Sequence, residues 1–433
     1  MKFGPGTAIA VIMANMIGTG VFTSLGYQLL DIQSPFVLLM LWVVGGIAAL
    51  CGALSYAELG ATLPRSGGEY NFLARIFHPG VGFVSGWISA TIGFAAPSAL
   101  AAITFGSYLS SVFPGLSPTW LACGLIVLLT TAHGSSRRSS ALVQQAFTLA
   151  KVLLIAAFCG LAAWLVPEPQ DIDLWPDKGD AAQLTSGAFA VSLIYVSYAF
   201  TGWNAATYLT GELERPQQTL SKVLLAGTAG VTVLYLLLNA TFLWVAPMEA
   251  MAGKLEIGYI AAQFAFGADG AAIMGTLLAL LLISTVSAMV MAGPRVLQVI
   301  GEDFSAFKTL ARTNKHGVPT AAIYAQSALA LGFILSASFE SILIFAGFTL
   351  GVSTLVTVAG LFVLRFRQPD LERPYRVIGY PLTPLIFLLI TGWTLTYIIL
   401  QRPTEAFWGL CIIAAGALFY AFSRWLSTLP RLR

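Results

Sequence analysis

The chain alternates between long apolar stretches and short polar ones. A helix needs about 20 apolar residues to cross the hydrocarbon core of a bilayer. The pattern therefore predicts an all-α polytopic membrane protein with twelve transmembrane helices. The expected spans lie at roughly 6–29, 35–60, 81–111, 119–134, 141–166, 185–211, 220–246, 270–299, 319–337, 340–364, 382–400 and 405–425. The fourth stretch is short and the third and eighth are long, so we expect tilted or kinked helices there.

Composition agrees with a chain that lies mostly in lipid. Of the 433 residues, 57% are hydrophobic and 9% are charged, whereas soluble domains carry about 25% charged residues. The formal net charge of +3 is too small to indicate a nucleic-acid partner. The four cysteines lie in apolar stretches and the three histidines are scattered, so we expect neither a metal site nor a cofactor.

The basic residues are distributed unevenly between the loops. With the N-terminus inside, 18 of the 22 Lys and Arg residues fall on the inner side and three on the outer side. Loops rich in Lys and Arg remain in the cytoplasm, so we expect both termini to be cytoplasmic. The first apolar stretch shows no clear cleavage site, and we interpret it as the first span rather than a signal peptide. We expect a single domain, 1–433, in the cytoplasmic (inner) membrane.

Two spans contain helix-breaking sequences at corresponding places. Span 1 has Gly-Thr-Gly at 18–20, and span 6 has Thr-Gly-Trp-Asn at 201–204. Irregular backbone at membrane depth is tolerated only where it is buried or lines a wet cavity. Each of these spans is the first of a five-helix set. The pair therefore predicts two inverted repeats, about 6–166 and 185–364, followed by two extra helices at about 382–425.

Unwound helices would expose backbone groups that suit a zwitterion. The half-helix starting near Thr19 would present free N–H groups and a positive dipole end to a carboxylate. The half-helix ending between Tyr198 and Thr201 would present free carbonyl groups to an ammonium. The alternative for Gly18 and Gly20 is that they only allow close helix packing.

Lys151 is the one basic residue expected deep within a span. Charged residues at this depth are costly and usually functional. We expect its ammonium to meet carbonyls at the span 1 break and the hydroxyls of Ser284 and Thr285, where it would replace a bound sodium ion. If Lys151 stays charged, transport needs no sodium and is consistent with exchange. If it loses its proton during transport, it could couple transport to a proton gradient. The third possibility is that the Lys151 ammonium has a structural role only.

Three motifs resemble those of the amino acid–polyamine–organocation family of transporters. They are Asn-Met-Ile-Gly-Thr-Gly-Val-Phe at 15–22, Tyr-Ala-Glu-Leu-Gly at 56–60 with Leu-Pro-Arg-Ser-Gly-Gly-Glu-Tyr at 63–70, and Gln-Pro-Asp-Leu-Glu-Arg-Pro-Tyr-Arg-Val at 368–377 with Gly-Tyr-Pro at 379–381. The Gly-Trp-Asn that follows an aromatic residue in span 6 is similar to the L-type branch. The resemblance covers nearly the whole chain and implies sodium-independent amino acid transport by alternating access, on two inverted five-helix repeats plus two helices.

The resemblance also implies a set of site residues. The substrate carboxylate would meet the N–H groups around Thr19 and Gly20, and the amino group would meet carbonyls of Met16, Tyr198 and Thr201. Tyr198 would be the aromatic gate, and Lys151 would stand where related carriers bind sodium. The full expected substrate site is Met16, Ile17, Gly18, Thr19, Gly20, Tyr198, Ala199, Phe200, Thr201 and Asn204.

Some positions depart from the family pattern. Thr201 stands where the L-type branch usually has Gly, which narrows the pocket or adds a hydroxyl. The outer loop 113–118 lacks the cysteine that animal members use for a disulfide, so no covalent partner subunit is implied. Arginine exchangers have an acid near the position of Asn204, and its absence argues against cationic amino acids and polyamines.

These observations favour a carrier of neutral L-amino acids that works as an exchanger or a proton symporter. The alternatives are a membrane sensor that reuses the fold, or a carrier of cationic amino acids or polyamines. We find no zinc-protease motif, nucleophile elbow or P-loop, so an enzyme is not expected. For Glu58 and Glu69, near the inner ends of spans 2 and 3, anchoring of the loop is favoured over a proton relay.

Overall fold

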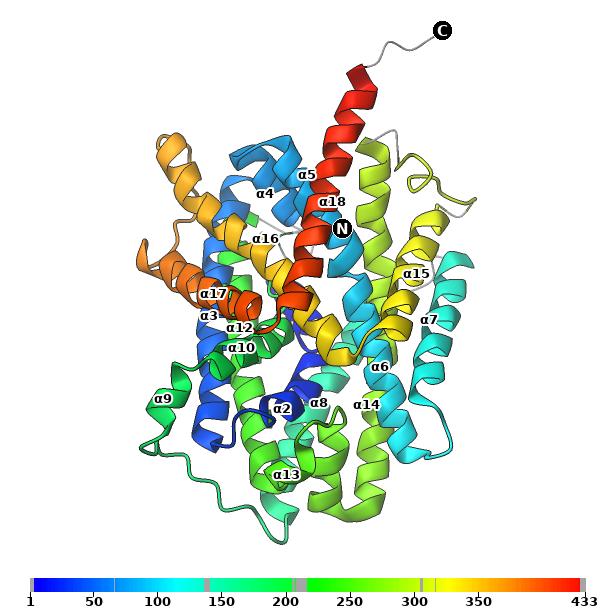
Figure 1. Ribbon diagram of the computed structural model, residues 1–433, viewed down its shortest axis with the longest axis vertical. Coiled ribbons are helices and arrows are strands. Elements are labelled where there is room, and N and C mark those ends of the chain that lie inside the picture. The colour runs from blue at the N-terminus through cyan, green and yellow to red at the C-terminus, as the bar shows by residue number, and fades with distance from the viewer. Residues whose placement is uncertain are drawn as a thin grey trace.

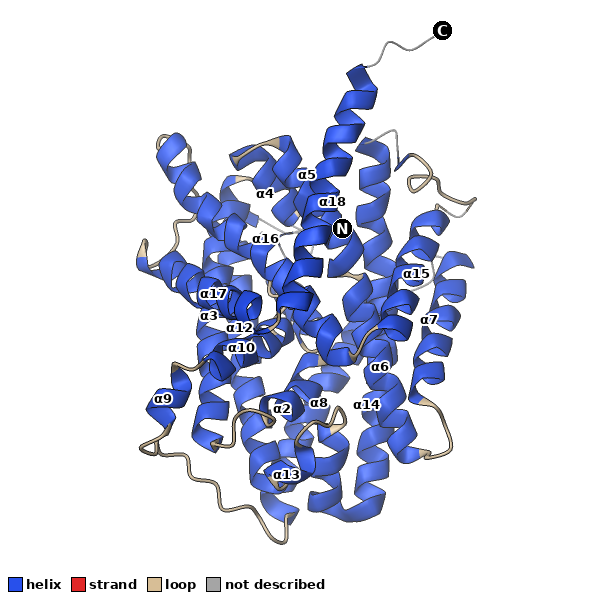
Figure 2. Ribbon diagram, viewed as in Figure 1, coloured by secondary structure: helices blue, strands red, loops and turns tan. Residues whose placement is uncertain are grey.

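A computed structural model describes residues 4–65, 67–135, 141–204, 207, 216–303, 307–315 and 317–428. All regular elements within these ranges are helical (Figure 2). The helices are α1 (Pro5–Met16), α2 (Gly20–Gln28), α3 (Pro35–Thr62), α4 (Gly68–Ile76), α5 (Pro79–Ile88), a π-helical turn (Ser89–Gly93), α6 (Ala95–Val112), α7 (Pro118–Ser135), α8 (Ala141–Leu165), α9 (Asp180–Leu184), α10 (Gly187–Ala199), α12 (Pro216–Val245), α13 (Met248–Met251), α14 (Ile257–Asp303), α15 (Thr320–Ser336), α16 (Phe339–Arg367), α17 (Leu382–Gln401) and α18 (Pro403–Thr428).

Eight helices in the described ranges are long and apolar enough to cross a membrane. Three shorter apolar helices, Pro118–Gly134, Gly187–Ala199 and Thr320–Ser336, accompany them. The prediction of an all-α, multi-pass membrane protein is thus confirmed. Local signals explain several helix starts: Pro35 and Pro79 occupy first-turn positions, and the Ser34 hydroxyl accepts a hydrogen bond from the amide of Val37 at 3.3 Å.

The two long apolar stretches are irregular, as expected. The third predicted span is divided by the π-helical turn Ser89–Gly93, so α5 and α6 are separate helices. The eighth expected span, 270–299, lies in α14, which starts at Ile257 and is divided by a kink at Gly267. Gly267 has a non-helical backbone with a positive φ of 72°, so one helical segment precedes the kink and the expected span follows it. Pro294 lies inside the same helix.

The helices surround the interrupted first span. α12 packs against both α1 and α3, α10 packs against α2, and α6 runs along α14. Figure 1 shows α4 at one end of the molecule and α9 and α13 at the opposite end. α17 and α18 are the least buried of the apolar spans, with 28% and 17% of their apolar windows buried. These two helices therefore leave most of their surface to lipid.

Candidate functional site

The breaks in spans 1 and 6 lie against each other at the centre of the molecule. α1 ends at Met16 and α2 starts at Gly20, and α10 ends at Ala199. A Cβ on Gly20 would lie 2.6 Å from the Cα of Ala199, closer than real Cβ contacts allow. Gly202 has a positive φ of 103°, and a Cβ there would lie 2.8 Å from the carbonyl carbon of Asn15. Each break is thus pressed against the end of the other helix. The rest of predicted span 6, 205–206 and 208–211, lies outside the described residues.

The start of α2 offers unused backbone donors. The N–H groups of Thr19, Gly20 and Val21 donate no hydrogen bond to any described residue, and bonding begins with the amide of Phe22, 3.0 Å from the carbonyl oxygen of Thr19. The first amides of a helix lack partners within it and carry its positive dipole end. This arrangement suits a carboxylate.

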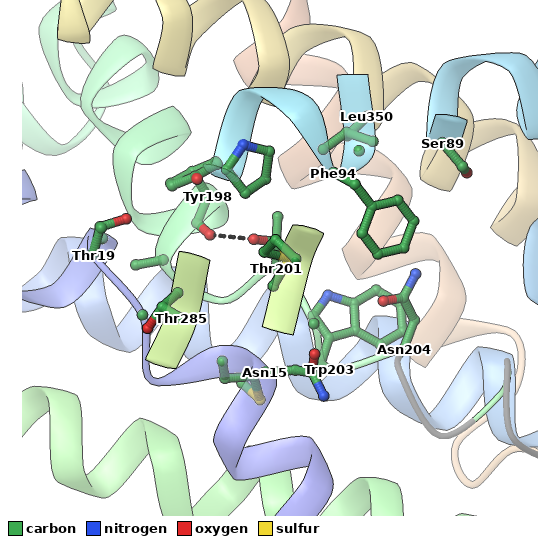
Figure 3. A pocket seen from close by; sticks show the side chains of 18 of the residues that line it. Asn15, Thr19, Ser89, Phe94, Tyr198, Thr201, Trp203, Asn204, Thr285 and Leu350 are labelled. Carbon is green, nitrogen blue, oxygen red and sulfur yellow. Dashed lines mark hydrogen bonds between the residues drawn. The ribbon is translucent and has the colours of Figure 1, made fainter. Parts of the chain in front are cut away.

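The carbonyls expected to be free are mostly occupied. The Met16 oxygen accepts from the amide of Gly18 at 2.7 Å and from the Tyr235 hydroxyl at 2.6 Å. The Tyr198 oxygen accepts from the amide and the hydroxyl of Thr201, at 2.9 and 2.6 Å (Figure 3). The sequence could not show that these carbonyls are occupied. The Tyr235 donor to Met16 lies on a distant helix, and the Thr201 hydroxyl reaches Tyr198 only in the conformation adopted at the break. The Thr201 carbonyl accepts no hydrogen bond from the described residues.

A cavity of about 290 Å³ lies beside the two breaks. Most of the expected site residues line it: Met16, Gly18, Thr19, Gly20, Tyr198, Ala199, Thr201, Asn204 and Thr285. In Figure 3, Thr19 and Asn204 lie on opposite sides of this space, and Tyr198 and Thr201 lie between them. Ile17 and Phe200 do not line it, because both are buried in the apolar core. The ring of Phe200 packs against that of Tyr235, with the two ring centroids 5.1 Å apart.

Lys151, on α8, is 94% buried, with only 6% of its surface exposed. Its ammonium donates a hydrogen bond of 2.7 Å to the hydroxyl of Thr285 on α14, and Thr285 lines the cavity. The hydroxyl of Ser284 instead donates to the carbonyl of Leu281 within its own helix, at 2.7 Å. Among the described residues, Lys151 makes no hydrogen bond to a carbonyl of the span 1 break. Of the expected partners, the structure therefore brings Thr285 to Lys151.

Tyr235 is a site residue that the sequence did not reveal. Its hydroxyl, on α12, lies 2.6 Å from the Met16 oxygen and 3.0 Å from the Ala199 oxygen. These carbonyls end α1 and α10, so one buried side chain joins both helix ends at the breaks. An isolated tyrosine in an apolar span gives no sequence signal for such a contact.

Glu69, on α4, also lines the cavity, although it is only 3% exposed. Its Oε1 accepts from the Tyr56 hydroxyl at 2.7 Å and from Nδ2 of Asn204 at 3.1 Å, and its Oε2 accepts from the Ser353 hydroxyl at 2.7 Å. The argument against cationic substrates considered an acid only at the position of Asn204, which is indeed not acidic. Folding nevertheless brings the carboxylate of Glu69 to the side chain of Asn204 from another helix.

Glu58 has a different environment. It is fully buried on α3, where its carboxylate pairs with Arg365 of α16 through contacts of 2.6 and 2.8 Å. It also accepts a hydrogen bond of 2.7 Å from the amide of Val377. These contacts agree with the favoured role of Glu58 in anchoring the loop that follows α16.

The remaining walls of the cavity come from elements far apart in the sequence. They are Asn15, Ser89, Gly93, Phe94, Pro97, Gly202, Trp203, Met289, Ala292, Leu350 and Thr354. Several of these residues lie at the π-helical turn Ser89–Gly93 or just after it. Their convergence depends on tertiary packing, and nothing in their local sequence marks it. Among the described residues, no group of three His, Cys, Asp or Glu side chains could hold a metal ion.

Comparison with known proteins agrees with this architecture. The family model described as "Amino acid permease" matches residues 3–422. The mouse b(0,+)-type amino acid transporter 1 is 27% identical over 424 residues, covering 96% of this chain and 86% of the relative. The large neutral amino acids transporter small subunit 2 of mouse is 28% identical over 433 residues, covering 97% and 80%, and the human protein of that name is similar at 28%, covering 97% and 79%. This chain therefore belongs to the amino acid permease family of multi-pass membrane transporters, which are not enzymes.

Proposed function

We propose that this protein is a sodium-independent secondary transporter of neutral L-amino acids that works by alternating access. The observation that carries the proposal is the cavity between two interrupted helices, with unused backbone amides at one wall. Its volume of about 290 Å³ suits a free amino acid. The name of the mouse relative that carries large neutral amino acids supports the same substrate class.

The substrate would bind through main-chain groups and lie across the cavity. The amides of Thr19, Gly20 and Val21 would hold its carboxylate. Its ammonium would meet the carbonyl of Thr201 and the carboxamide oxygen of Asn204, on the opposite side in Figure 3. Tyr198 would be the aromatic gate, because it is 5% exposed and lies between these two walls.

Lys151 would replace a sodium ion. Its ammonium donates a hydrogen bond to the hydroxyl of Thr285, a residue of the cavity wall. It would thereby provide a fixed positive charge where a metal cation would otherwise be needed. Uptake would then require no sodium. Exchange and proton symport are both compatible with this arrangement.

The proposed membrane arrangement has twelve spans. The first ten would form two inverted repeats, about 6–166 and 185–364, and the helices at about 382–425 would lie outside them as part of one domain, 1–433. Both termini would be cytoplasmic, in the inner membrane. The free cysteines Cys51, Cys123, Cys159 and Cys411 all lie outside loop 113–118, so the chain would act without a covalently attached subunit.

Transport of cationic amino acids or polyamines is the second candidate, and Glu69 in the cavity wall favours it. A substrate cation would need a carboxylate oxygen as its partner. Both oxygens already accept hydrogen bonds, from Tyr56, Asn204 and Ser353, and the side chain is 3% exposed. A substrate cation would have to displace these donors, so the neutral class is favoured.

Uptake by proteoliposomes tests the proposal. Purified protein should take up labelled neutral L-amino acids without sodium, and internal unlabelled amino acid or an imposed pH gradient should distinguish exchange from symport. A steep sodium requirement would contradict the role of Lys151, and displacement of neutral amino acids by arginine or putrescine would favour the second candidate. Binding without any uptake would identify a sensor.

A further inference from the structure

Glu69 is a buried carboxyl group without a charged partner among the described residues. The ion pairs found there join Glu58 to Arg365 and Arg373, and Glu340 to Arg402. Glu69 instead accepts hydrogen bonds only from neutral groups, and it lines the cavity. A buried carboxylate without a countercharge is costly and readily takes up a proton.

The surroundings of Glu69 contain few groups that could titrate in its place. The helices α3, α5 and α16 pack against α4. From α3, the Tyr56 hydroxyl faces Glu69, while Glu58 is held by Arg365 of α16.

From α16, the Ser353 hydroxyl faces Glu69, and Arg367 donates to the carbonyl of Ile76. From α5, the Ser85 hydroxyl lies 3.0 Å from that of Ser353. The charged or titratable residues at the far end of α4, Arg75 and His78, are exposed.

Burial is the largest influence on this carboxyl. It raises the pKa of Glu69 above the ordinary value for glutamate, although hydrogen bonds from Tyr56, Ser353, Asn204 and Ser85 act in the opposite direction. Glu69 also lines the cavity, so its carboxyl group is not sealed within packed helices. Protonation at this position therefore requires less acid than at an exposed glutamate.

The contact between Glu69 and Asn204 connects this charge to the substrate region. Nδ2 of Asn204 donates to Oε1 of Glu69, and among the described residues nothing donates to the amide oxygen of Asn204. Because an amide NH₂ group can donate but not accept, it suits a charged carboxylate. A protonated carboxyl accepts more weakly and carries a hydrogen of its own. The hydroxyls of Tyr56 and Ser353 can rotate to accept that hydrogen, whereas Asn204 can accept it only by turning its oxygen toward Glu69.

We propose that Glu69 is a proton-binding site whose charge sets which end of the Asn204 carboxamide faces the substrate. This inference rests on the proposed function. When Glu69 is charged, Asn204 presents its oxygen to the substrate ammonium. When Glu69 binds a proton, the contact loosens or reverses, Asn204 presents NH₂, and the ammonium loses an acceptor. Proton binding and amino acid binding therefore oppose each other.

Binding measurements at several pH values test this switch. Purified protein in detergent is titrated with L-alanine and L-leucine through the acidic and neutral range. The fraction of charged Glu69 falls as pH falls, so the wild-type affinity should decrease below the pKa of Glu69. The decrease should be at most about tenfold for each pH unit, and it should stop at the weak affinity of the protonated form. Glu69→Gln should bind weakly and equally at every pH, because glutamine cannot become charged. Glu302→Gln is the matched control, since Glu302 is exposed and contacts Gln298 on the same helix.

Two further measurements keep the test decisive if Glu69→Gln does not fold. Ser353→Ala removes one donor that stabilises the charged carboxylate, so its loss of affinity should begin at a higher pH than in the wild type. Infrared spectra should show a protonated-carboxyl band that titrates over the same pH range as binding. Substrate affinity that is independent of pH in the wild type, or full pH dependence in Glu69→Gln, would overturn the switch alone. Absence of amino acid binding at every pH would contradict the proposed function as well.

Discussion

The ammonium of Lys151 and the hydroxyl of Thr285 are joined by a hydrogen bond of 2.7 Å between α8 and α14. Thr285 contributes to the cavity wall, whereas the neighbouring Ser284 bonds to its own helix. The contact thus joins the charge on α8 to the place where substrate is proposed to bind, and the two adjacent hydroxyls differ in their hydrogen-bond partners.

Lys151→Ala should abolish most transport and leave folded protein in the membrane. The substitution removes the fixed charge beside the cavity, while the apolar walls around it remain. Thr285→Val should also reduce transport, because it leaves the ammonium without this acceptor. Ser284→Ala is the control and should transport as the wild type does. Uptake rates, with surface or membrane protein measured in parallel, check the set, and wild-type rates in Lys151→Ala would remove this residue from the mechanism.

Gly20→Ala should impair folding or transport much more than Gly18→Ala. The added methyl group on residue 20 would lie 2.6 Å from the Cα of Ala199, and this backbone cannot move without separating the two breaks. At Gly18 the nearest atoms are 3.9 Å away, which is an ordinary contact. Overpacking of this kind typically costs about 1–3 kcal/mol. Melting temperatures in detergent compare the pair, and equal stability of the two variants would contradict the close crossing.

Tyr235→Phe should lower substrate affinity and thermal stability. It removes the hydroxyl that joins the Met16 and Ala199 carbonyls while keeping the ring that packs on Phe200. Loss of a buried hydrogen bond costs roughly 0.5–1.5 kcal/mol. Tyr324→Phe is a suitable control, since Tyr324 is 52% exposed. Substrate-binding titrations and melting curves should show a change in the first variant only.

Glu58→Ala should destabilise the protein by about 3 kcal/mol, since it leaves Arg365 without its buried partner. We expect the lower end of the usual range, because the Arg365 side chain is 21% exposed. Glu340→Ala should cost less, because the Arg402–Glu340 pair is more exposed, at 34% and 23%. Melting temperatures of the two variants give the comparison, and the reverse order would contradict the anchoring role of Glu58.

The fold class and the centre of the site could be predicted from the sequence. Apolar stretches of membrane length, and glycines within them, depend only on local composition, and they correctly located the ends of α1 and α10. Most of the expected site residues line the cavity for the same reason. Ile17 and Phe200 were included because of their position beside the breaks. Only the direction of their side chains, which the packed helices decide, places them in the core.

The partners of these residues could not be predicted in the same way. Tyr235 and Glu69 reach the breaks from helices that are distant in the sequence, and Ser353 contacts Glu69 from a third helix. The motif at 63–70 marked Glu69 as notable, but it did not show that Asn204 would be its partner. The occupied carbonyl of Met16 shows the same limit, because its donor Tyr235 lies on α12. Free acceptors can be inferred from a helix break, but donors from other helices depend on how the helices pack together.

The Tyr235 hydroxyl has one hydrogen and two carbonyl neighbours, so it can serve only one of them fully at a given moment. The two carbonyls end α1 and α10, so any movement that separates these helix ends breaks at least one of the two contacts. The phenol can keep the other contact, so its hydroxyl need not lose every partner inside the membrane when the ends part.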